Sequence, residues 1–200
     1  MIGGGVNMSA VFWINYKRVY WQCGQVATAD TFSSQVFCCK SLHHPTASDI
    51  HCPHNLNCFH NYEEGLAYAK KVNKPIILDF TGWSCVNCRK MEDNVWIDPE
   101  VGNLIKNEYV LIQLYVDERT IEMPADKVHY SKYLKGKTTD LGKWNQDLQA
   151  TRYGANSQPY YVLADHNLNE LVKPEGAILN DNKAYVAFLQ SGLDKFKPSN

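Results

Sequence analysis

The stretch "DFTGWSCVNCRKME", residues 79–92, decides how this 200-residue sequence is interpreted. It places Cys85 and Cys88 in a C-x-x-C spacing, directly after a glycine, a tryptophan and a serine that indicate a turn. Two acids, Asp79 and Glu92, stand at its ends. Such a cysteine pair can act as a redox couple, supply half of a zinc site, or pack as two inert thiols. The rest of the sequence has to separate these alternatives.

The segments on either side of the turn predict a strand that leads into a helix. "KPIILDF", residues 74–80, is typical of a buried strand, and "CVNCRKMEDNVW", residues 85–96, is helical in composition. Cys85 then lies in the first helical turn, where unpaired backbone N–H groups and the helix dipole favour a thiolate. The thiolate is the attacking species in disulfide exchange. Cys88, one turn further on, can expel a bound partner from the resulting mixed disulfide.

The zinc and inert-thiol alternatives are the weaker ones. A structural zinc site needs four ligands, and the sequence after Cys88 contains no cysteine and only two distant histidines, His129 and His166. Inert core thiols do not fit the exposed turn that precedes Cys85. The sequence therefore favours a redox-active pair, and we assign no metal ligand.

Composition excludes several classes of protein. The chain is 44% hydrophobic and 20% charged, which allows a folded core, and its net charge of −1 gives no basic excess for nucleic-acid binding. The apolar runs are shorter than the ~20 residues that span a bilayer. The first residues show no basic segment before the apolar stretch and no evident cleavage site, so we expect neither a signal peptide nor a transmembrane segment.

Apolar periodicity from residue 56 onward predicts an α/β domain with a mixed central sheet and helices on both faces. Asn61 is a plausible helix N-cap, and a short opening strand is expected within residues 57–60. A polar, lysine-containing loop is expected over residues 118–140. The other expected elements are helices at 61–72, 85–96, 98–108, 141–153 and 181–196, strands at 74–80 and 109–117, and a β-hairpin at 159–174.

The beginning of the chain carries weaker signals. We expect residues 1–54 to form an irregular or partly ordered extension and residues 55–200 to form the domain. Seven cysteines are an odd number, so at least one thiol stays unpaired in a monomer. Three alternatives stay open for the Cys/His cluster at residues 51–60: a Cys52–Cys58 disulfide, a metal site, or no specific role. The cysteines in the first 60 residues are Cys23, Cys38, Cys39, Cys52 and Cys58.

Two segments together resemble a known family. "ILDFTGWSCVNC", residues 77–88, resembles the active-site segment of thioredoxins, and "RYGANSQPYYVL", residues 152–163, resembles their segment in which Tyr-Gly precedes a cis-proline. Over roughly residues 55–198, including "CVNCRKMEDNVWIDPEV" at 85–101, the sequence resembles more closely the C-terminal thioredoxin-like domain of the bacterial transmembrane thiol:disulfide interchange proteins, the DsbD family, in its Bacteroides-type branch. The resemblance implies a thioredoxin-like fold.

The resemblance also implies roles for single residues. Cys85 would be the nucleophile and Cys88 the resolving thiol. Pro159 would be a cis-proline that faces the disulfide, and Gln158 would offer its backbone to the extended chain of a partner. The alternative for Pro159 is an ordinary proline at the start of a strand.

Three further residues are candidates at the same site. Asp79 is expected to be buried beneath the turn, where a raised pKa suits a proton acceptor for Cys88; the alternative is a strand-end acid that caps the turn. Glu92 would be a second acid that tunes the cysteine pair, against the alternative of a solvated helix residue. Trp83 is expected to shield the disulfide and contact partners, against the alternative of plain packing.

The expected function is thiol:disulfide exchange in the reducing direction at the periplasmic face of the bacterial inner membrane. Electrons would arrive from a membrane-embedded dithiol and leave to the disulfide of a partner protein, with Cys85–Cys88 as the redox group and no cofactor. A monomer that binds no nucleic acid is expected. The alternatives are a binding module with little turnover, a metal-binding protein that uses residues 51–60, and a cytoplasmic location if the chain is a stand-alone form. Because the family's membrane helices and N-terminal domain are not found, we expect a fragment, a truncated product or a divergent stand-alone form.

Overall fold

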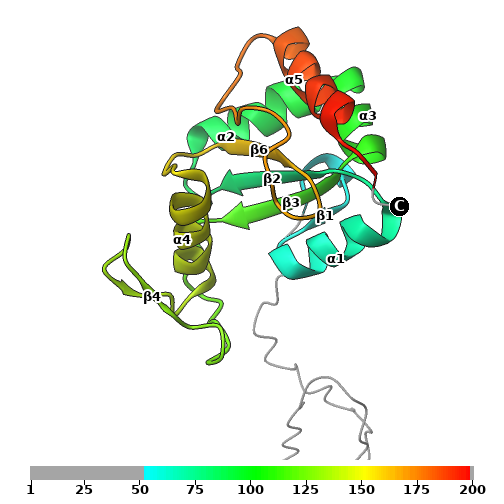
Figure 1. Ribbon diagram of the computed structural model, residues 1–200. Coiled ribbons are helices and arrows are strands. Elements are labelled where there is room, and N and C mark those ends of the chain that lie inside the picture. Colours follow the sequence, from blue (N-terminus) through cyan, green and yellow to red (C-terminus); the bar gives the residue numbers. More distant parts are fainter. Residues whose placement is uncertain (1–51, 199–200) are drawn as a thin grey trace, which may run out of the picture. The chain divides into compact units, whose positions relative to one another are not determined.

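The computed structural model describes residues 52–198. These residues form a mixed sheet with helices on both faces (Figure 1). The expected position of the opening strand is confirmed, since β1 falls within residues 57–60. The elements in chain order are η2 (Pro53–Asn55), β1 (Cys58–Phe59), α1 (Tyr62–Val72), β2 (Ile76–Thr81), α2 (Val86–Met91), the π-helical turn η3 (Glu92–Trp96), α3 (Pro99–Glu108), β3 (Val110–Tyr115), β4 (Tyr130–Ser131), β5 (Gly136–Lys137), α4 (Leu141–Tyr153), β6 (Tyr160–Ala164) and α5 (Asn182–Lys195).

The central sheet has the strand order β1-β3-β2-β6. β3 pairs with both β1 and β2 in parallel, whereas β6 runs antiparallel to β2. All six residues of β2 and all six of β3 are buried, as expected for central strands that are covered on both faces. The prediction of a mixed sheet is confirmed.

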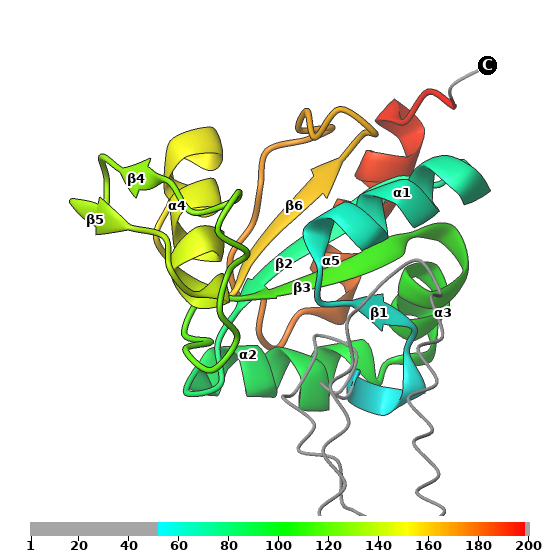
Figure 2. The same ribbon diagram turned by 90° about the horizontal axis from the view of Figure 1, so that it is seen from below.

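Each face of the sheet has its own core, because side chains alternate along a strand. On one face, Ile77 and Leu111 pack in a cluster with residues of α2, η3, α3 and α5. On the other face, Ile76, Leu78 and Ile112 pack in a cluster with residues of α1 and α4. Figures 1 and 2 show this division: α2, α3 and α5 lie on one side of the strands and α1 and α4 on the other. By the same alternation, Asp79 and Gln113 face the side that α2 covers.

Capping residues fix where the helices begin. The side chain of Asn61 accepts hydrogen bonds from the backbone N–H groups of Glu63 and Glu64, at 2.9 and 3.1 Å, so the predicted N-cap of α1 is confirmed. Asp98 caps α3 in the same way, which makes α3 a new helix and not a continuation of η3. Asp140 accepts from the N–H of Lys143 at the start of α4.

Two sequence-based expectations need correction. The predicted hairpin has only one regular strand, β6; residues 170–175 contact it at two isolated bridges, Tyr161–Glu175 and Ala164–Glu170. Between these two bridges, β6 has two residues, 162 and 163, and the opposite segment has four, 171–174, so a regular ladder cannot form. The predicted loop at 118–140 contains a short hairpin, β4–β5, which lies beside α4 and away from the central sheet (Figures 1 and 2).

Within residues 52–198, none of the helices is long and apolar enough to cross a membrane. The predicted extension at 1–54 lies outside the described residues except for its last three, and Cys23, Cys38, Cys39 and His51 lie outside them as well.

Candidate active site

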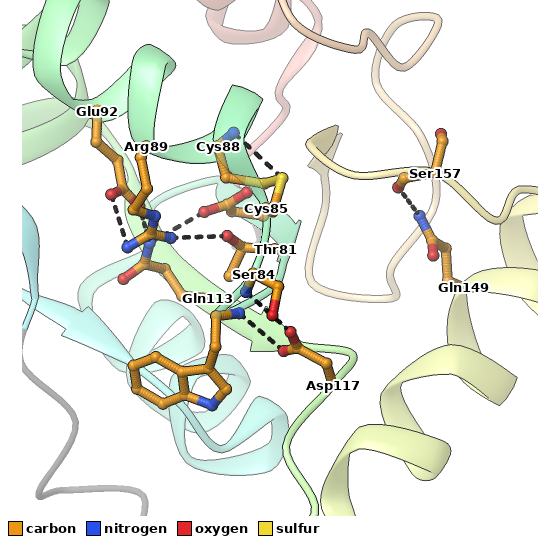
Figure 3. Close-up of a disulfide and its surroundings, with 12 residues drawn as sticks. Thr81, Ser84, Cys85, Cys88, Arg89, Glu92, Gln113, Asp117, Gln149 and Ser157 are labelled. Atoms are coloured by element: carbon orange, nitrogen blue, oxygen red, sulfur yellow. Dashed lines mark hydrogen bonds and ion pairs between the residues drawn. A yellow bond between two sulfur atoms is a disulfide. The ribbon is translucent and has the colours of Figure 1, made fainter.

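The turn between β2 and α2 is held by one carboxylate. Asp117, which follows β3, accepts hydrogen bonds from the backbone N–H groups of Trp83 at 2.8 Å and Ser84 at 3.1 Å (Figure 3 shows Asp117 beside Ser84). A Cβ atom at Gly82 would lie 3.1 Å from Oδ2 of Asp117, so a glycine lets the carboxylate approach this closely. This contact fixes the turn that leads from β2 to Cys85 and Cys88.

Cys85 and Cys88 form a disulfide at the start of α2 (Figure 3). Cys85 is the N-cap residue, and its Sγ accepts a hydrogen bond from the backbone N–H of Cys88 at 3.2 Å. The two sulfurs differ in accessibility: Cys85 is half-buried, whereas Cys88 is only 2% exposed. A partner molecule can therefore reach Cys85 more readily than Cys88.

Beneath the pair, a buried amide joins two buried acids. The Nε2 of Gln113 donates to Oδ2 of Asp79 at 3.0 Å and to Oε1 of Glu92 at 3.3 Å. Asp79 and Gln113 are directly paired in the register of β2 and β3, which explains why they share one face. The other oxygen of Asp79, Oδ1, is buried and has no hydrogen-bond partner among the described residues. That oxygen can receive a proton without breaking an existing hydrogen bond.

Burial controls the protonation of both acids. Removal from water raises the pKa of Asp79 to about 7, and the nearby charge of Glu92 adds to this rise, while Gln113 and Arg89 oppose it. Burial also raises the pKa of Glu92, and the charge of Arg89 is the main opposing influence. An acid with a pKa near 7 can both accept and release a proton at neutral pH. The alternative interpretation of Glu92 as a solvated residue is wrong, because only 5% of its side chain is exposed.

Arg89 completes this network. Its Nη1 lies 2.9 Å from Oε2 of Glu92 and its Nη2 donates to Oγ1 of Thr81 at 3.1 Å (Figure 3). The guanidinium thus places one positive charge between the helix that carries Cys88 and the end of β2. It offsets part of the negative charge of the two acids.

A cleft with a volume of about 410 Å³ opens beside Cys85. Gln158 lines it together with residues of the turn, of α4 and of the segment before β6, and the lining residues also include Ser84, Asn87, Asp117, Gln146 and Asn156. The Gln158–Pro159 peptide bond is cis. The Nε2 of Gln149 donates to the backbone oxygen of Ser157 at 2.8 Å and so fixes the segment before this bond to α4 (Figure 3).

The predicted site residues are therefore brought together, with one difference in arrangement. Trp83 is half-exposed, but its ring stacks on Tyr115 at a centroid distance of 4.1 Å and its Nε1 donates to Oε2 of Glu118 at 3.0 Å. It does not line the cleft beside Cys85. Its expected contact with partners stays a prediction.

The Cys/His cluster at the edge of the sheet resolves into a disulfide between Cys52 and Cys58, one of the three alternatives. Their sulfurs and a ring nitrogen of His60 lie within 4.8 Å of one another. Metal binding at this cluster would require thiolates, and disulfide sulfurs do not supply them. In the oxidised form, these residues are thus a cross-link and not a ligand set.

Three residues of the site were not predicted from the sequence, namely Arg89, Gln113 and Asp117. Gln113 carried a readable signal, since it is a polar residue in the middle of the apolar run "YVLIQLYV", as Asp79 is in "PIILDF". Arg89 and Asp117 carried none, because an arginine on a helix and an aspartate after a strand are ordinary surface residues.

Comparison with known families agrees with this geometry. Residues 57–134 match a family described as thioredoxin-like, a range that contains Asp79, Cys85, Cys88, Glu92 and Gln113. The matched range and the observed strand order together show a thioredoxin-like fold. Among curated proteins, none matches this chain.

Solved structures give low-identity matches. A DsbH oxidoreductase is 27% identical, with a TM-score of 0.49, and the match covers 70% of this chain and 85% of that one. A thioredoxin from Thermus thermophilus is 21% identical, with a TM-score of 0.49 and coverage of 68% and 86%. The C-terminal domain of DsbD from Neisseria meningitidis, in the oxidised form, is 15% identical, with a TM-score of 0.45 and coverage of 68% and 99%. The thioredoxin-like fold and the C-x-x-C disulfide fit a thiol:disulfide oxidoreductase.

Proposed function

We propose that this thioredoxin-like domain reduces disulfide bonds in partner proteins through the Cys85–Cys88 pair. The observation that carries the proposal is the asymmetry of the pair: an accessible sulfur beside a cleft, a buried sulfur, and a buried carboxyl group below with one oxygen unpartnered. No cofactor is needed, because the two cysteines themselves carry the two electrons.

The reaction proceeds by two displacements. In the reduced protein, the thiolate of Cys85 attacks one sulfur of the partner's disulfide, and the other partner sulfur leaves as a thiolate and takes up a proton. The thiol of Cys88 then loses its proton and attacks Sγ of Cys85. This second step releases the partner's remaining sulfur and forms the Cys85–Cys88 disulfide. The partner gains two electrons and two protons.

Asp79 is proposed as the acceptor of the Cys88 proton. Its pKa of about 7 and its unpartnered oxygen suit that role. Glu92 and Gln113 act on Asp79 and not on the sulfurs: the glutamate raises its pKa by charge, and the amide stabilises its ionised form by a hydrogen bond. In the cleft, Gln158 would offer backbone groups to the partner's extended chain, with Pro159 fixing that segment.

The source of the electrons belongs to the proposal as well. Cys85–Cys88 would be reduced again by a membrane-embedded dithiol, and the protein would work as a monomer on the periplasmic side of a bacterial inner membrane. This part rests on the resemblance of the segments around Cys85 and Pro159 to the DsbD family, including its Bacteroides-type branch.

Insulin reduction tests the proposed activity. The wild-type chain with dithiothreitol as the electron source should speed the reduction of insulin disulfides, and the Cys85→Ser variant should lose this acceleration. The Cys88→Ser variant should also turn over poorly, because it cannot resolve the mixed disulfide. Turnover that survives in Cys85→Ser would rule the proposal out, and a binding module without activity would show no acceleration in the wild type.

A further inference from the structure

The disulfide between Cys52 and Cys58 lies at the accessible margin of the sheet and also contacts the active-site network. Among the described residues, β1, which carries Cys58, pairs with β3 alone and forms an edge of the central sheet. Both cysteines are half-buried and not enclosed in the core. An attacking thiol can therefore approach this bond from outside the sheet.

Within residues 52–198, the side chains of His60 and Gln113 lie close to the sulfur of Cys58. The Nε2 of His60 lies 3.3 Å from Sγ of Cys58 and 4.0 Å from Sγ of Cys52. The Oε1 of Gln113 lies 3.4 Å from Sγ of Cys58. A disulfide sulfur carries no proton, so in the oxidised form the second contact is not a hydrogen bond. A Cys58 thiol would carry one and could donate it to Gln113.

Gln113 is the link to the catalytic pair, because the other end of the same amide donates to Asp79 and Glu92. An amide whose oxygen accepts a hydrogen bond becomes a stronger donor through its nitrogen. A stronger donor favours the ionised form of the carboxylates that it contacts. The protonation state of Cys58 can thus act on Asp79 through two consecutive contacts, Cys58 to Gln113 and Gln113 to Asp79.

A second set of contacts runs from the same histidine to the active-site turn. The ring of His60 lies 5.8 Å from the ring of Tyr115, and Tyr115 stacks on Trp83 at 4.1 Å. Trp83 belongs to the turn that Asp117 holds. The loop closed by the disulfide also places Nε2 of His54 3.8 Å from Oδ1 of Asp93, next to Glu92.

We propose that Cys52–Cys58 is a second exchange-competent disulfide, whose redox state adjusts the Cys85–Cys88 equilibrium through Gln113. The proposal rests on the proposed function of Cys85–Cys88. In the reaction, a thiolate of a dithiol attacks Sγ of Cys52, and Cys58 leaves as a thiolate beside His60. The second thiol of the reductant then displaces Cys52. Two electrons and two protons pass to the cysteines, and the dithiol becomes a disulfide.

The first test measures both pairs in one protein. The full chain is equilibrated in buffers of reduced and oxidised dithiothreitol and quenched with acid. Peptide mapping after alkylation then gives the state of each pair separately. We expect Cys52–Cys58 to open and close reversibly within the buffers that reduce Cys85–Cys88. If it stays closed where Cys85–Cys88 is fully reduced, the proposal is overturned. If Cys85–Cys88 itself does not respond, the proposed function has failed instead.

The second test isolates the proton on residue 58. The double variant Cys52→Ser/Cys58→Ser keeps a hydroxyl donor facing Gln113, whereas the matched Cys52→Ala/Cys58→Ala has none. A hydrogen bond that stabilises the ionised form of Asp79 makes this carboxylate a weaker acceptor of the Cys88 proton. It therefore disfavours the thiolate of Cys88 in the reduced pair. At pH 7 we therefore expect the equilibrium constant for reduction of Cys85–Cys88 by dithiothreitol to be on the order of fivefold lower in the serine pair. Equal constants in the two variants would overturn the coupling.

The variant Gln113→Met provides the control for the route of coupling, because it keeps the side-chain length and removes both the oxygen and the nitrogen of the amide. The difference between the serine and alanine pairs should disappear in this background. A difference that persists there would show that Gln113 does not carry the coupling. The comparison of the two pairs in the wild-type background stands even if the Gln113→Met protein does not fold.

Discussion

At the scale of single residues, Asp79 is the feature with the largest physical consequence. Its carboxyl group is 1% exposed, and its pKa is about 7 in the folded chain against 3.8 for an ordinary aspartate. The folded protein therefore holds a proton that the unfolded chain loses at a lower pH. As pH rises from about 4 to 7, the free energy of unfolding falls, by up to roughly 4 kcal/mol for this group alone.

The variant Asp79→Asn should remove that penalty. We expect the variant to be more stable than the wild type in urea unfolding. The difference between their free energies of unfolding should increase by roughly 2–3 kcal/mol between pH 5 and pH 8. It should at the same time reduce insulin more slowly, because the proton acceptor is gone. If this difference in the free energy of unfolding stays constant with pH, Asp79 titrates at its ordinary value.

Glu92 gives a second prediction at this scale. Its charge raises the pKa of Asp79, so Glu92→Gln should move the pH dependence of insulin reduction to lower pH. Glu100→Gln is the matched control, because Glu100 is an exposed acid at the start of α3. The measurement is kcat/KM against pH for the three proteins. If the inflection in the pH dependence of kcat/KM stays at the same pH or moves to higher pH in Glu92→Gln, the role assigned to Glu92 is contradicted.

At the scale of elements, the turn between β2 and α2 depends on a carboxylate from outside it. Asp117→Ala removes the acceptor of two backbone N–H groups, and we expect a loss of about 1–3 kcal/mol in the free energy of unfolding. Insulin reduction should also slow, because the turn positions Cys85. Asp126→Ala, at an exposed position, is the control and should change neither quantity. If the Asp117→Ala protein is as stable and active as the wild type, the turn keeps its conformation without the carboxylate of Asp117.

The elements also show what could be predicted from sequence. Helices α1, α4 and α5 were predicted within one or two residues, because their caps and apolar faces are encoded locally. The second strand of the 159–174 hairpin was predicted wrongly, because alternation alone does not show that the two segments have unequal numbers of residues between their bridges. The bridge between Asp79 and Glu92 was not predictable, since it depends on the register that sets Gln113 opposite Asp79.

At the scale of the whole described domain, α5 holds the last part of the chain against the sheet. Gly192 makes this approach possible, because a Cβ atom there would lie 2.5 Å from Oη of Tyr109 and 2.6 Å from Cδ1 of Leu163. Gly192→Ala should therefore lower the free energy of unfolding by about 1–3 kcal/mol. Gln190→Ala, on the exposed face of the same helix, is the control. Both folded proteins should reduce insulin at the wild-type rate.

The fold positions residues of the site that lie far apart in the sequence. The thioredoxin-like fold brings Cys85, Asp79 and Gln158 into one region from three separate segments of the chain. The roles of these residues and the identity of partners depend on chemistry that no periodicity encodes. Only an exchange reaction on the protein itself reports them.

Capture of a reaction intermediate tests the central claim most directly. The Cys88→Ser chain, reduced and then mixed with a disulfide-containing protein such as insulin, should accumulate a covalent mixed disulfide. Peptide mapping should locate that bond at Cys85, and Cys85→Ser should form none there. The absence of an adduct, or an adduct located only at another cysteine, would contradict the account.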